Sequence, residues 1–262
     1  WVDRSRSEVM TGDPNDFREV LTFIWYPAEP DTGTDAEYLP DTSILSDTLV
    51  QSGELAWWQV QALRFVRSNS PLDARPLMTQ SPYPVIIFSP GNGTNVEFYS
   101  ALAGEIASHG YVLVGINHPY DVSAVVLSHG SVGPYDKSQW SLGAADHQAY
   151  TRERMKVRVA DLLFALEQVE KLGTNKDNPF FGMLDLGAIA AAGHSLGGEP
   201  ASEACKVDRR FKACLNFDGH HNSALFERVD DPAEAAQENW RVARARILRT
   251  VDRQQHRFQQ FR

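Results

Sequence analysis

The sequence predicts an α/β domain whose central sheet is mostly parallel and is covered by helices on both faces. Short apolar runs bounded by Gly, Pro, Asn and Asp alternate with segments of helical period along most of the chain. Gly-rich turns directly follow two of these runs. No linker-like break divides the alternation, so residues 1–262 are expected to form a single domain.

Composition limits the class of protein before any motif is considered. The chain has 262 residues and a formal net charge of −9, which argues against nucleic acid as a partner because like charges repel. No apolar run approaches the roughly 18 residues of a transmembrane segment, and no signal peptide is evident at the start. Cys205 and Cys214 are interpreted as buried thiols, with a local disulfide as the alternative.

The first half of the chain contains three expected strands and two expected helices. The strands lie at 20–26, 85–88 and 111–116, and the helices lie at 54–66 and from 94 or 95 to about 108. Four apolar residues share one face of the first helix: Leu55, Trp58, Ala62 and Phe65. Thr94 or Asn95 can cap the second helix, and Gly110 is placed to end it.

The second half begins with a segment that has no regular period. Residues 121–146 contain several glycines and are expected to leave the sheet as a candidate lid or substrate loop. The remaining elements are a long amphipathic helix at 148–172, strands at 188–192, 212–217 and 246–251, and a helix at 196–206.

The sharpest motif is Gly193-His194-Ser195-Leu196-Gly197, which matches the G-x-S-x-G pattern of a nucleophile elbow. An apolar strand enters it and a helix-compatible segment leaves it, as this motif requires. A side chain at Gly193 or Gly197 would collide with the neighbouring strand or helix. The turn is expected to hold the Ser195 hydroxyl at the carboxyl edge of the sheet, beside a helix N-terminus. An inert serine in a structural turn is the alternative.

A serine nucleophile needs a base, and the base needs an acid that orients it. The chain order in this architecture is Ser, acid, His. Asp218 directly follows the strand at 212–217 and is the candidate acid, with a simple Asp-Gly turn as the alternative. Four other aspartates fit this position less well: Asp208, Asp230, Asp231 and Asp252.

Three histidines follow the candidate acid: His220, His221 and His256. His220 and His221 are too close to Asp218 in sequence to come from a separate strand end, so they are interpreted as residues that line the pocket. His256 lies a few residues beyond the expected strand at 246–251 and is the candidate base. An exposed histidine in a polar tail is the alternative.

The oxyanion hole of such a site needs two backbone N–H groups. One is expected from Leu196, and the other from Asn92 in the turn after the strand at 85–88. Gly91 and Gly93 shape this turn, because glycine lets the backbone approach a substrate closely. An ordinary strand-to-helix turn is the alternative.

The chain resembles the platelet-activating-factor acetylhydrolase family of α/β-hydrolases, in its plasma-type and bacterial branch. The matching segments are Asp3-Arg4-Ser5-Arg6, Ile24-Trp25-Tyr26-Pro27, Phe88-Ser89-Pro90-Gly91-Asn92-Gly93, Ala107-Ser108-His109-Gly110-Tyr111, Gly193-His194-Ser195-Leu196-Gly197-Gly198 and Leu215-Asn216-Phe217-Asp218. The resemblance implies the α/β-hydrolase fold and supports Asp218 as the acid and Asn92 and Leu196 as the oxyanion hole. The family has two strands between acid and base, but only one is evident here. The region is therefore shortened, residues are absent from the chain, or His256 is not the base.

The expected activity is hydrolysis of carboxylic esters with short acyl groups through an acyl-enzyme, which the resemblance extends to phospholipid sn-2 acyl groups. Gly91, Gly93, His194 and Tyr120 are expected to contact the substrate. The alternatives are a general lipase or polyester hydrolase, a dienelactone-hydrolase-like lactonase, and a catalytically silent binding protein of the same fold.

Neither a cofactor nor a metal is expected, since the histidines form no H-E-x-x-H pattern and no Cys/His cluster. The expected partner is a small ester or a lipid, with peripheral contact to lipid surfaces. Four aromatic residues are candidates to line an apolar cleft, or to be core: Trp57, Trp58, Tyr120 and Trp140. The resemblance favours a secreted or periplasmic protein, and the cytoplasm remains an alternative.

Overall fold

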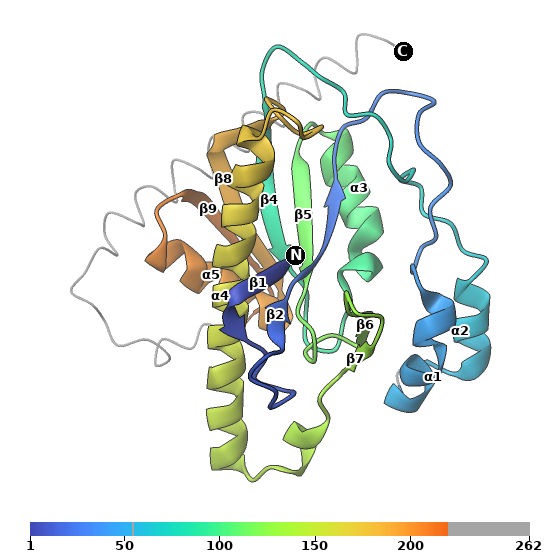
Figure 1. The fold of residues 1–262 in the computed structure, drawn as a ribbon, viewed down its shortest axis with the longest axis vertical. Coiled ribbons are helices and arrows are strands. Elements are labelled where there is room, and N and C mark those ends of the chain that lie inside the picture. The colour runs from blue at the N-terminus through green and yellow to red at the C-terminus, as the bar shows by residue number, and fades with distance from the viewer. Residues whose placement is uncertain (54, 220–262) are drawn as a thin grey trace.

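A five-stranded sheet forms the centre of the fold (Figure 1). The computed structural model describes residues 1–53 and 55–219 of the chain. The strands in sheet order are β3 (Leu21–Trp25), β5 (Val112–Asn117), β4 (Tyr83–Ser89), β8 (Leu184–His194) and β9 (Phe211–Phe217). The last four run parallel, and β3 pairs antiparallel with β5 at one edge. The predicted mostly parallel sheet of an α/β-hydrolase fold is therefore confirmed.

Helices cover both faces of this sheet. On one face lie α4 (Ala144–Thr174) and α5 (Gly198–Val207), and on the other lies α3 (Ser100–Ser108) (Figure 1). Val85 and Ile87 of β4 pack with Leu162 of α4, whereas Phe88 packs with Ala103 of α3. Successive side chains of a strand point to opposite faces, so a strand that is buried on both sides reads as a continuous apolar run.

Most expected elements exist, with shifted boundaries. The strand expected at 20–26 is β3, and the residues before it form a separate hairpin of β1 (Val2–Ser7) and β2 (Phe17–Glu19). The long helix begins four residues earlier than expected, at Ala144. The strand expected at 188–192 is the middle of β8. The strand expected at 246–251 lies outside the described residues.

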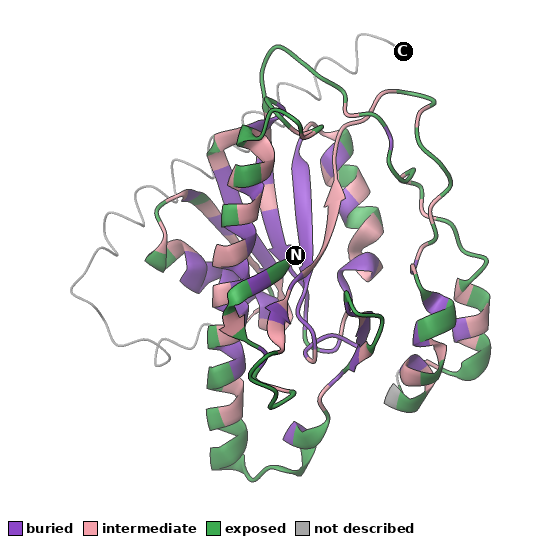
Figure 2. Cartoon of the chain, in the orientation of Figure 1, coloured by how far each residue is buried: buried purple, intermediate pink, exposed green. Residues whose placement is uncertain are grey.

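The segment around the first expected helix departs most from the prediction. It contains two helices, α1 (Thr42–Ser52) and α2 (Trp57–Leu63), where one was expected at 54–66. These two helices form the α1–α2 hairpin, which packs through Leu45, Leu49 and Val60 against β6, outside the central sheet. Trp58 and Phe65 are 66% and 84% exposed, so the apolar face expected to include them does not enter the core. Figure 2 shows this hairpin mostly in the colours of exposed and intermediate residues.

The segment at 121–146 leaves the sheet as expected. It forms a small hairpin of β6 (Ala124–Val126) and β7 (Val132–Pro134) and a short 3₁₀ helix, η2 (Ser138–Ser141). Residues 121–125 are buried, so the start of the segment is fixed within the fold. Its role as a lid or substrate loop stays a prediction.

Two smaller expectations are corrected. The Asn95 side chain does not cap the 3₁₀ helix η1 (Val96–Tyr99) that precedes α3, because its amide donates to the carbonyl of Ala124 instead. Cys205 and Cys214 form a disulfide between α5 and β9, so the buried-thiol interpretation is wrong. The Cα atoms are 6.4 Å apart, a separation that a disulfide can span.

Candidate active site

The nucleophile elbow joins β8 to α5. Ser195 has a φ of 49°, one of six positive values among the described residues other than glycine. This left-handed conformation is strained for a residue with a side chain and often marks a functional turn. The strand ends at His194, a 3₁₀ turn covers Ser195–Gly197, and α5 begins at Gly198. The strand–turn–helix context that the motif requires is thus present.

Glycines let this turn pack against the end of β4. A Cβ atom at Gly193 would overlap the carbonyl of Gly197, and one at Gly197 would overlap the carbonyls of Ser89 and Pro90. All of these atoms belong to the backbone, which a side-chain rotation cannot move. The elbow and the β4 end are therefore in backbone contact, as the spacing of the glycines predicts.

Asp218 lies beside the elbow in the next strand of the sheet. The parallel register pairs His194 with Phe217, so Asp218 follows β9 at the level where Ser195 follows β8. Asp218 has a φ of 58°. A Cβ atom at Gly219 would lie 2.5 Å from the Ser195 carbonyl oxygen, which places the Asp218-Gly219 turn against the elbow.

The candidate base lies outside the described residues. His220, His221 and His256 all belong to 220–262, so the assignment of the base stays a prediction. Asp208 lies at the C-terminus of α5, whereas Ser195 lies at the other end of that helix, and the Asp208 carboxylate pairs with Arg210 at 2.6 Å. Asp230, Asp231 and Asp252 lie outside the described residues as well.

The turn after β4 lies directly against Ser195. A Cβ atom at Gly91 would lie 3.6 Å from the Ser195 Cβ, so the two segments touch. Gly93 has a φ of 69°, a conformation that glycine adopts without strain. Leu196 follows Ser195 within the 3₁₀ turn. The structure therefore brings together Ser195, Leu196 and the 91–93 turn.

Each residue from Ser89 to Gly93 makes a hydrogen bond to another element. Ser89 Oγ lies 2.9 Å from His118 Nε2. The Pro90 carbonyl accepts from Arg158 and the Asn92 amide donates to the Tyr135 hydroxyl. The other two bonds are from Gly91 N–H to the Tyr99 hydroxyl and from Gly93 N–H to the Asp121 carbonyl. These hydrogen bonds together fix the position of the turn.

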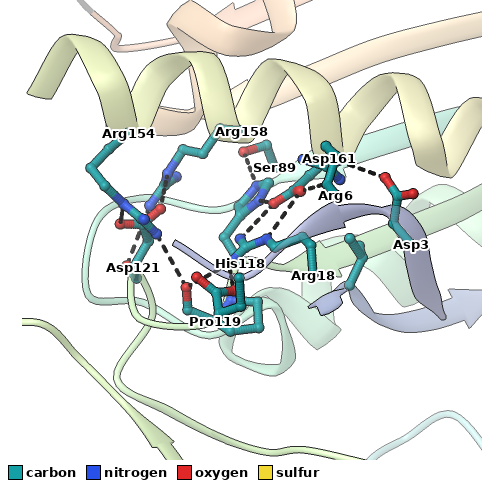
Figure 3. A network of polar contacts seen from close by, with 12 residues as sticks. Asp3, Arg6, Arg18, Ser89, His118, Pro119, Asp121, Arg154, Arg158 and Asp161 are labelled. Atoms are coloured by element: carbon teal, nitrogen blue, oxygen red, sulfur yellow. Dashed lines mark hydrogen bonds and ion pairs between the residues drawn. The ribbon is translucent and has the colours of Figure 1, made fainter. Parts of the chain in front are cut away.

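A buried ionic network lies beneath the turn (Figure 3). The Asp161 carboxylate is fully buried. It forms ion pairs with Arg18 at 2.7 Å and with Arg6 at 2.8 Å. His118 Nδ1 lies 2.8 Å from the same carboxylate. Burial alone would raise the pKa of Asp161, but Arg18 and His118 outweigh it and hold that pKa below its usual range.

A second carboxylate, Asp121, completes the network. It binds Arg154 at 2.8 Å and Arg158 at 3.3 Å. Burial alone would raise the pKa of Asp121. The guanidinium groups of Arg158 and Arg154 outweigh burial and hold this pKa below its usual range. Arg158 therefore joins this carboxylate to the Pro90 carbonyl, 2.9 Å from its Nη1.

Ser89, His118 and Asp161 have the connectivity of a catalytic triad but lie in the interior. All three residues are fully buried, so their position beneath the turn fits a structural role. Burial lowers the pKa of His118 to about 4, which keeps its imidazole neutral near pH 7. The neutral ring can accept from Ser89 and donate to Asp161.

Two expected substrate contacts occupy different places. His194 lies at the elbow, with its Nδ1 2.8 Å from the Tyr99 hydroxyl. Tyr120 has a φ of 69°, and burial raises the pKa of its hydroxyl, with the Glu8 and Asp16 carboxylates adding to the rise. Its contact with substrate stays a prediction.

Sequence reasoning missed the residues that hold the turn. Arg154, Arg158 and Asp161 are spaced by four and three positions, so they share one face of α4, and that face is buried. Charged residues on the buried face of a long helix were the available signal. Tyr99 and His118 carry no comparable pattern, because each is a single residue near a strand or helix end.

The described residues contain neither a group of metal-ligating side chains nor a helix that could span a membrane. Within 1–53 and 55–219 no three His, Cys, Asp or Glu side chains are grouped to hold a metal ion. In the same residues no helix combines the length and the apolar character needed to cross a membrane.

The family is established by a match that covers most of the chain. A family model described as platelet-activating factor acetylhydrolase, isoform II, matches residues 6–231. The chain belongs to this family. The resemblance to this acetylhydrolase family that was inferred from the motifs is thereby confirmed.

Two mammalian relatives and one fungal relative are similar over different lengths. A platelet-activating factor acetylhydrolase of Canis lupus familiaris is 26% identical over 246 residues, which cover 83% of this chain and 54% of the relative. The one of Cavia porcellus is 27% identical, with 81% and 52% covered. A probable 1-alkyl-2-acetylglycerophosphocholine esterase of Arthroderma benhamiae is 31% identical, with 52% and 31% covered. The chain spans about half the length of the mammalian relatives.

One solved structure supports the fold independently. A ferulic acid esterase from Streptomyces cinnamoneus has a TM-score of 0.63 and 26% identity to this chain. The match covers 92% of this chain and 67% of the esterase.

Replacing Gly197 by Ala is expected to displace the elbow of this acetylhydrolase-family chain, because the new Cβ would overlap two backbone carbonyls. We expect the rate at which a fluorophosphonate labels Ser195 to fall on the order of 100-fold. The control is Gly143→Ala, at a φ of −64°, where the nearest atom to the Cβ is 4.0 Å away. Equal labelling of both variants would contradict the backbone contact.

Stability is expected to fall as the pH is lowered from about 6.5 to about 4, because the unfolded chain protonates His118 in this range and the folded chain does not. The slope for one histidine is at most about 1.4 kcal/mol per pH unit. Urea unfolding at several pH values should show a flatter dependence in His118→Gln than in the wild type. His109→Gln, at the C-terminal end of α3, should keep the wild-type slope, and an unchanged slope in His118→Gln would be the contrary result.

Proposed function

We propose that the protein is a serine hydrolase of carboxylic esters. One observation carries the proposal: Ser195 sits in a strained elbow that touches both the 91–93 turn and the Asp218-Gly219 turn. A nucleophile, an oxyanion-binding loop and an acid at neighbouring strand ends are the parts that acyl transfer needs. Family membership and the esterase fold neighbour support the same reaction class.

The proposed reaction follows from these positions. The Ser195 hydroxyl attacks the ester carbonyl and gives its proton to a histidine, for which we propose His256, oriented by Asp218. The N–H groups of Asn92 and Leu196 stabilise the oxyanion. The histidine then protonates the departing alcohol. A water molecule gives a proton to the same histidine as it attacks the acyl-enzyme, and the histidine returns this proton to the Ser195 oxygen as the acyl–oxygen bond breaks. The products are a carboxylic acid and the free enzyme.

The proposed substrates are esters with short acyl groups, including the sn-2 acyl group of phospholipids. The names of the mammalian and fungal relatives, an acetylhydrolase and a 1-alkyl-2-acetylglycerophosphocholine esterase, support this choice. The ferulic acid esterase favours a broader esterase as the second candidate. Initial rates on a 2-acetyl phospholipid and on a feruloyl ester of matched concentration distinguish the two.

Peripheral contact with lipid is proposed for the α1–α2 hairpin. Several large apolar side chains are exposed on or just after its helices: Ile44 (50%), Trp57 (64%), Trp58 (66%) and Phe65 (84%). Several large apolar side chains exposed on one hairpin favour a surface that binds an apolar partner. Tryptophan is suited to the boundary between water and acyl chains, since its ring is apolar and its N–H is polar.

Ser195→Ala is expected to lower ester turnover by several orders of magnitude, because the nucleophile is lost. The measurement is kcat on p-nitrophenyl acetate, with Ser141→Ala, an exposed serine of η2, as the control. Asp218→Asn and His256→Ala should each lose most activity as well. Near-normal turnover by Ser195→Ala would refute the mechanism, and an inactive His220→Ala beside an active His256→Ala would reassign the base.

Replacing Trp57 and Trp58 together by Ser is expected to weaken binding to phosphatidylcholine vesicles about tenfold or more, since each buried aromatic ring contributes on the order of 2 kcal/mol. Turnover of soluble p-nitrophenyl acetate should not change. The control is Trp140→Ser, whose side chain is 76% exposed on η2 and does not belong to the hairpin. Equal vesicle binding by the double variant and by the wild type would exclude the hairpin as the lipid contact.

A further inference from the structure

The Tyr99 hydroxyl bridges the two halves of the site. It accepts a hydrogen bond from Gly91 N–H at 3.2 Å and lies 2.8 Å from His194 Nδ1. Gly91 immediately precedes Asn92, and His194 immediately precedes Ser195. One oxygen atom therefore connects the two segments. It binds the residue before Asn92 in one of them and the residue before Ser195 in the other.

The position of Tyr99 is fixed by elements outside the site. Tyr99 ends η1, whose first residue, Val96, donates its N–H to Asn117 Oδ1 at 2.7 Å. The Asn117 amide donates in turn to Glu97 at 2.7 Å. The Tyr99 ring also packs edge-on against Phe88, with centroids 4.9 Å apart. The hydroxyl is therefore presented by a rigid support.

The tautomer of His194 determines which way its hydrogen bond with Tyr99 runs. Burial raises the pKa of Tyr99, so the side chain stays a phenol at neutral pH. Its oxygen already accepts from Gly91, and its own proton can be donated to His194 Nδ1. This donation requires the His194 tautomer with its proton on Nε2.

We propose that the Tyr99 hydroxyl is a positioning group that holds the oxyanion turn in register with the nucleophile elbow. The inference deepens the proposed ester hydrolysis and rests on it. Asn92 and Leu196, the two donors proposed for the oxyanion, each lie one or two residues from an atom that this hydroxyl binds. Oxyanion donors act only within a narrow range of distance, so a small shift of either segment weakens both.

The space around Gly91 supports this role. A Cβ atom there would lie 3.3 Å from His194 Nδ1 and 3.4 Å from the Tyr99 hydroxyl. The glycine thus allows the hydroxyl, the imidazole and the turn to meet at short range. An alanine at position 91 would press on the same two partners.

Tyr99→Phe removes the hydroxyl and keeps the ring. We expect kcat on p-nitrophenyl acetate to fall about 10- to 100-fold, with KM changed by less than about threefold. The matched control is Tyr111→Phe, a buried tyrosine just before the amino end of β5. The melting temperatures of the two variants should be similar, and Tyr111→Phe should keep wild-type kcat.

A second measurement separates positioning from a general loss of structure. The rates of an ester and its thionoester are compared, because the sulfur of the thionoester is a poor acceptor for oxyanion N–H groups. The wild type should prefer the ester strongly, and Tyr99→Phe should lose about tenfold of this preference. A purely structural defect would slow both substrates equally and leave the ratio unchanged.

The outcomes are distinguishable from failure of the proposed function. If wild-type protein neither hydrolyses esters nor labels with a fluorophosphonate, the proposed function itself fails. If the wild type is active and Tyr99→Phe keeps its kcat and its ester preference, the positioning role is overturned. A lower kcat with a reduced ester preference supports it.

Discussion

The interaction on which the site depends is the neutralisation of a carboxylate in the interior. Asp161 on α4 is fully buried, and an isolated charge there would be very unfavourable. Two arginines from the N-terminal segment and a histidine from the end of β5 satisfy it. Breaking such a cluster by removing one partner is costly, because it leaves the others buried and unpaired. The cluster therefore fixes α4 against the strand ends that carry the site.

The consequence for the site is rigidity at a point where loops are usually mobile. His118, Arg158 and Tyr99 hold the end of β4 and the turn after it through hydrogen bonds to three successive residues, 89–91. The elbow then packs on this fixed segment through Gly197. The two turns are thereby held in place by contacts from the surrounding elements, as a preorganised site requires.

The sheet and the elbow could be predicted from sequence because their signals are local. An apolar run such as Val85–Phe88 predicts a buried strand, and the glycines around Ser195 predict a tight turn. The exposure of Trp58 and Phe65 could not be predicted, since a helical apolar pattern does not reveal whether a partner covers it. Nor could the pairing of Asp161 with Arg18, because it joins residues far apart in the chain.

The disulfide between Cys205 and Cys214 has a consequence for the integrity of the protein. It links the helix that follows Ser195 to the strand that precedes Asp218. Residues 205–214 thus form a covalently closed ring that contains the end of α5 and the start of β9. A peptide bond cleaved within that ring would not release Ser195 from Asp218, so the two halves of the molecule would remain a single covalent unit until the bridge was reduced.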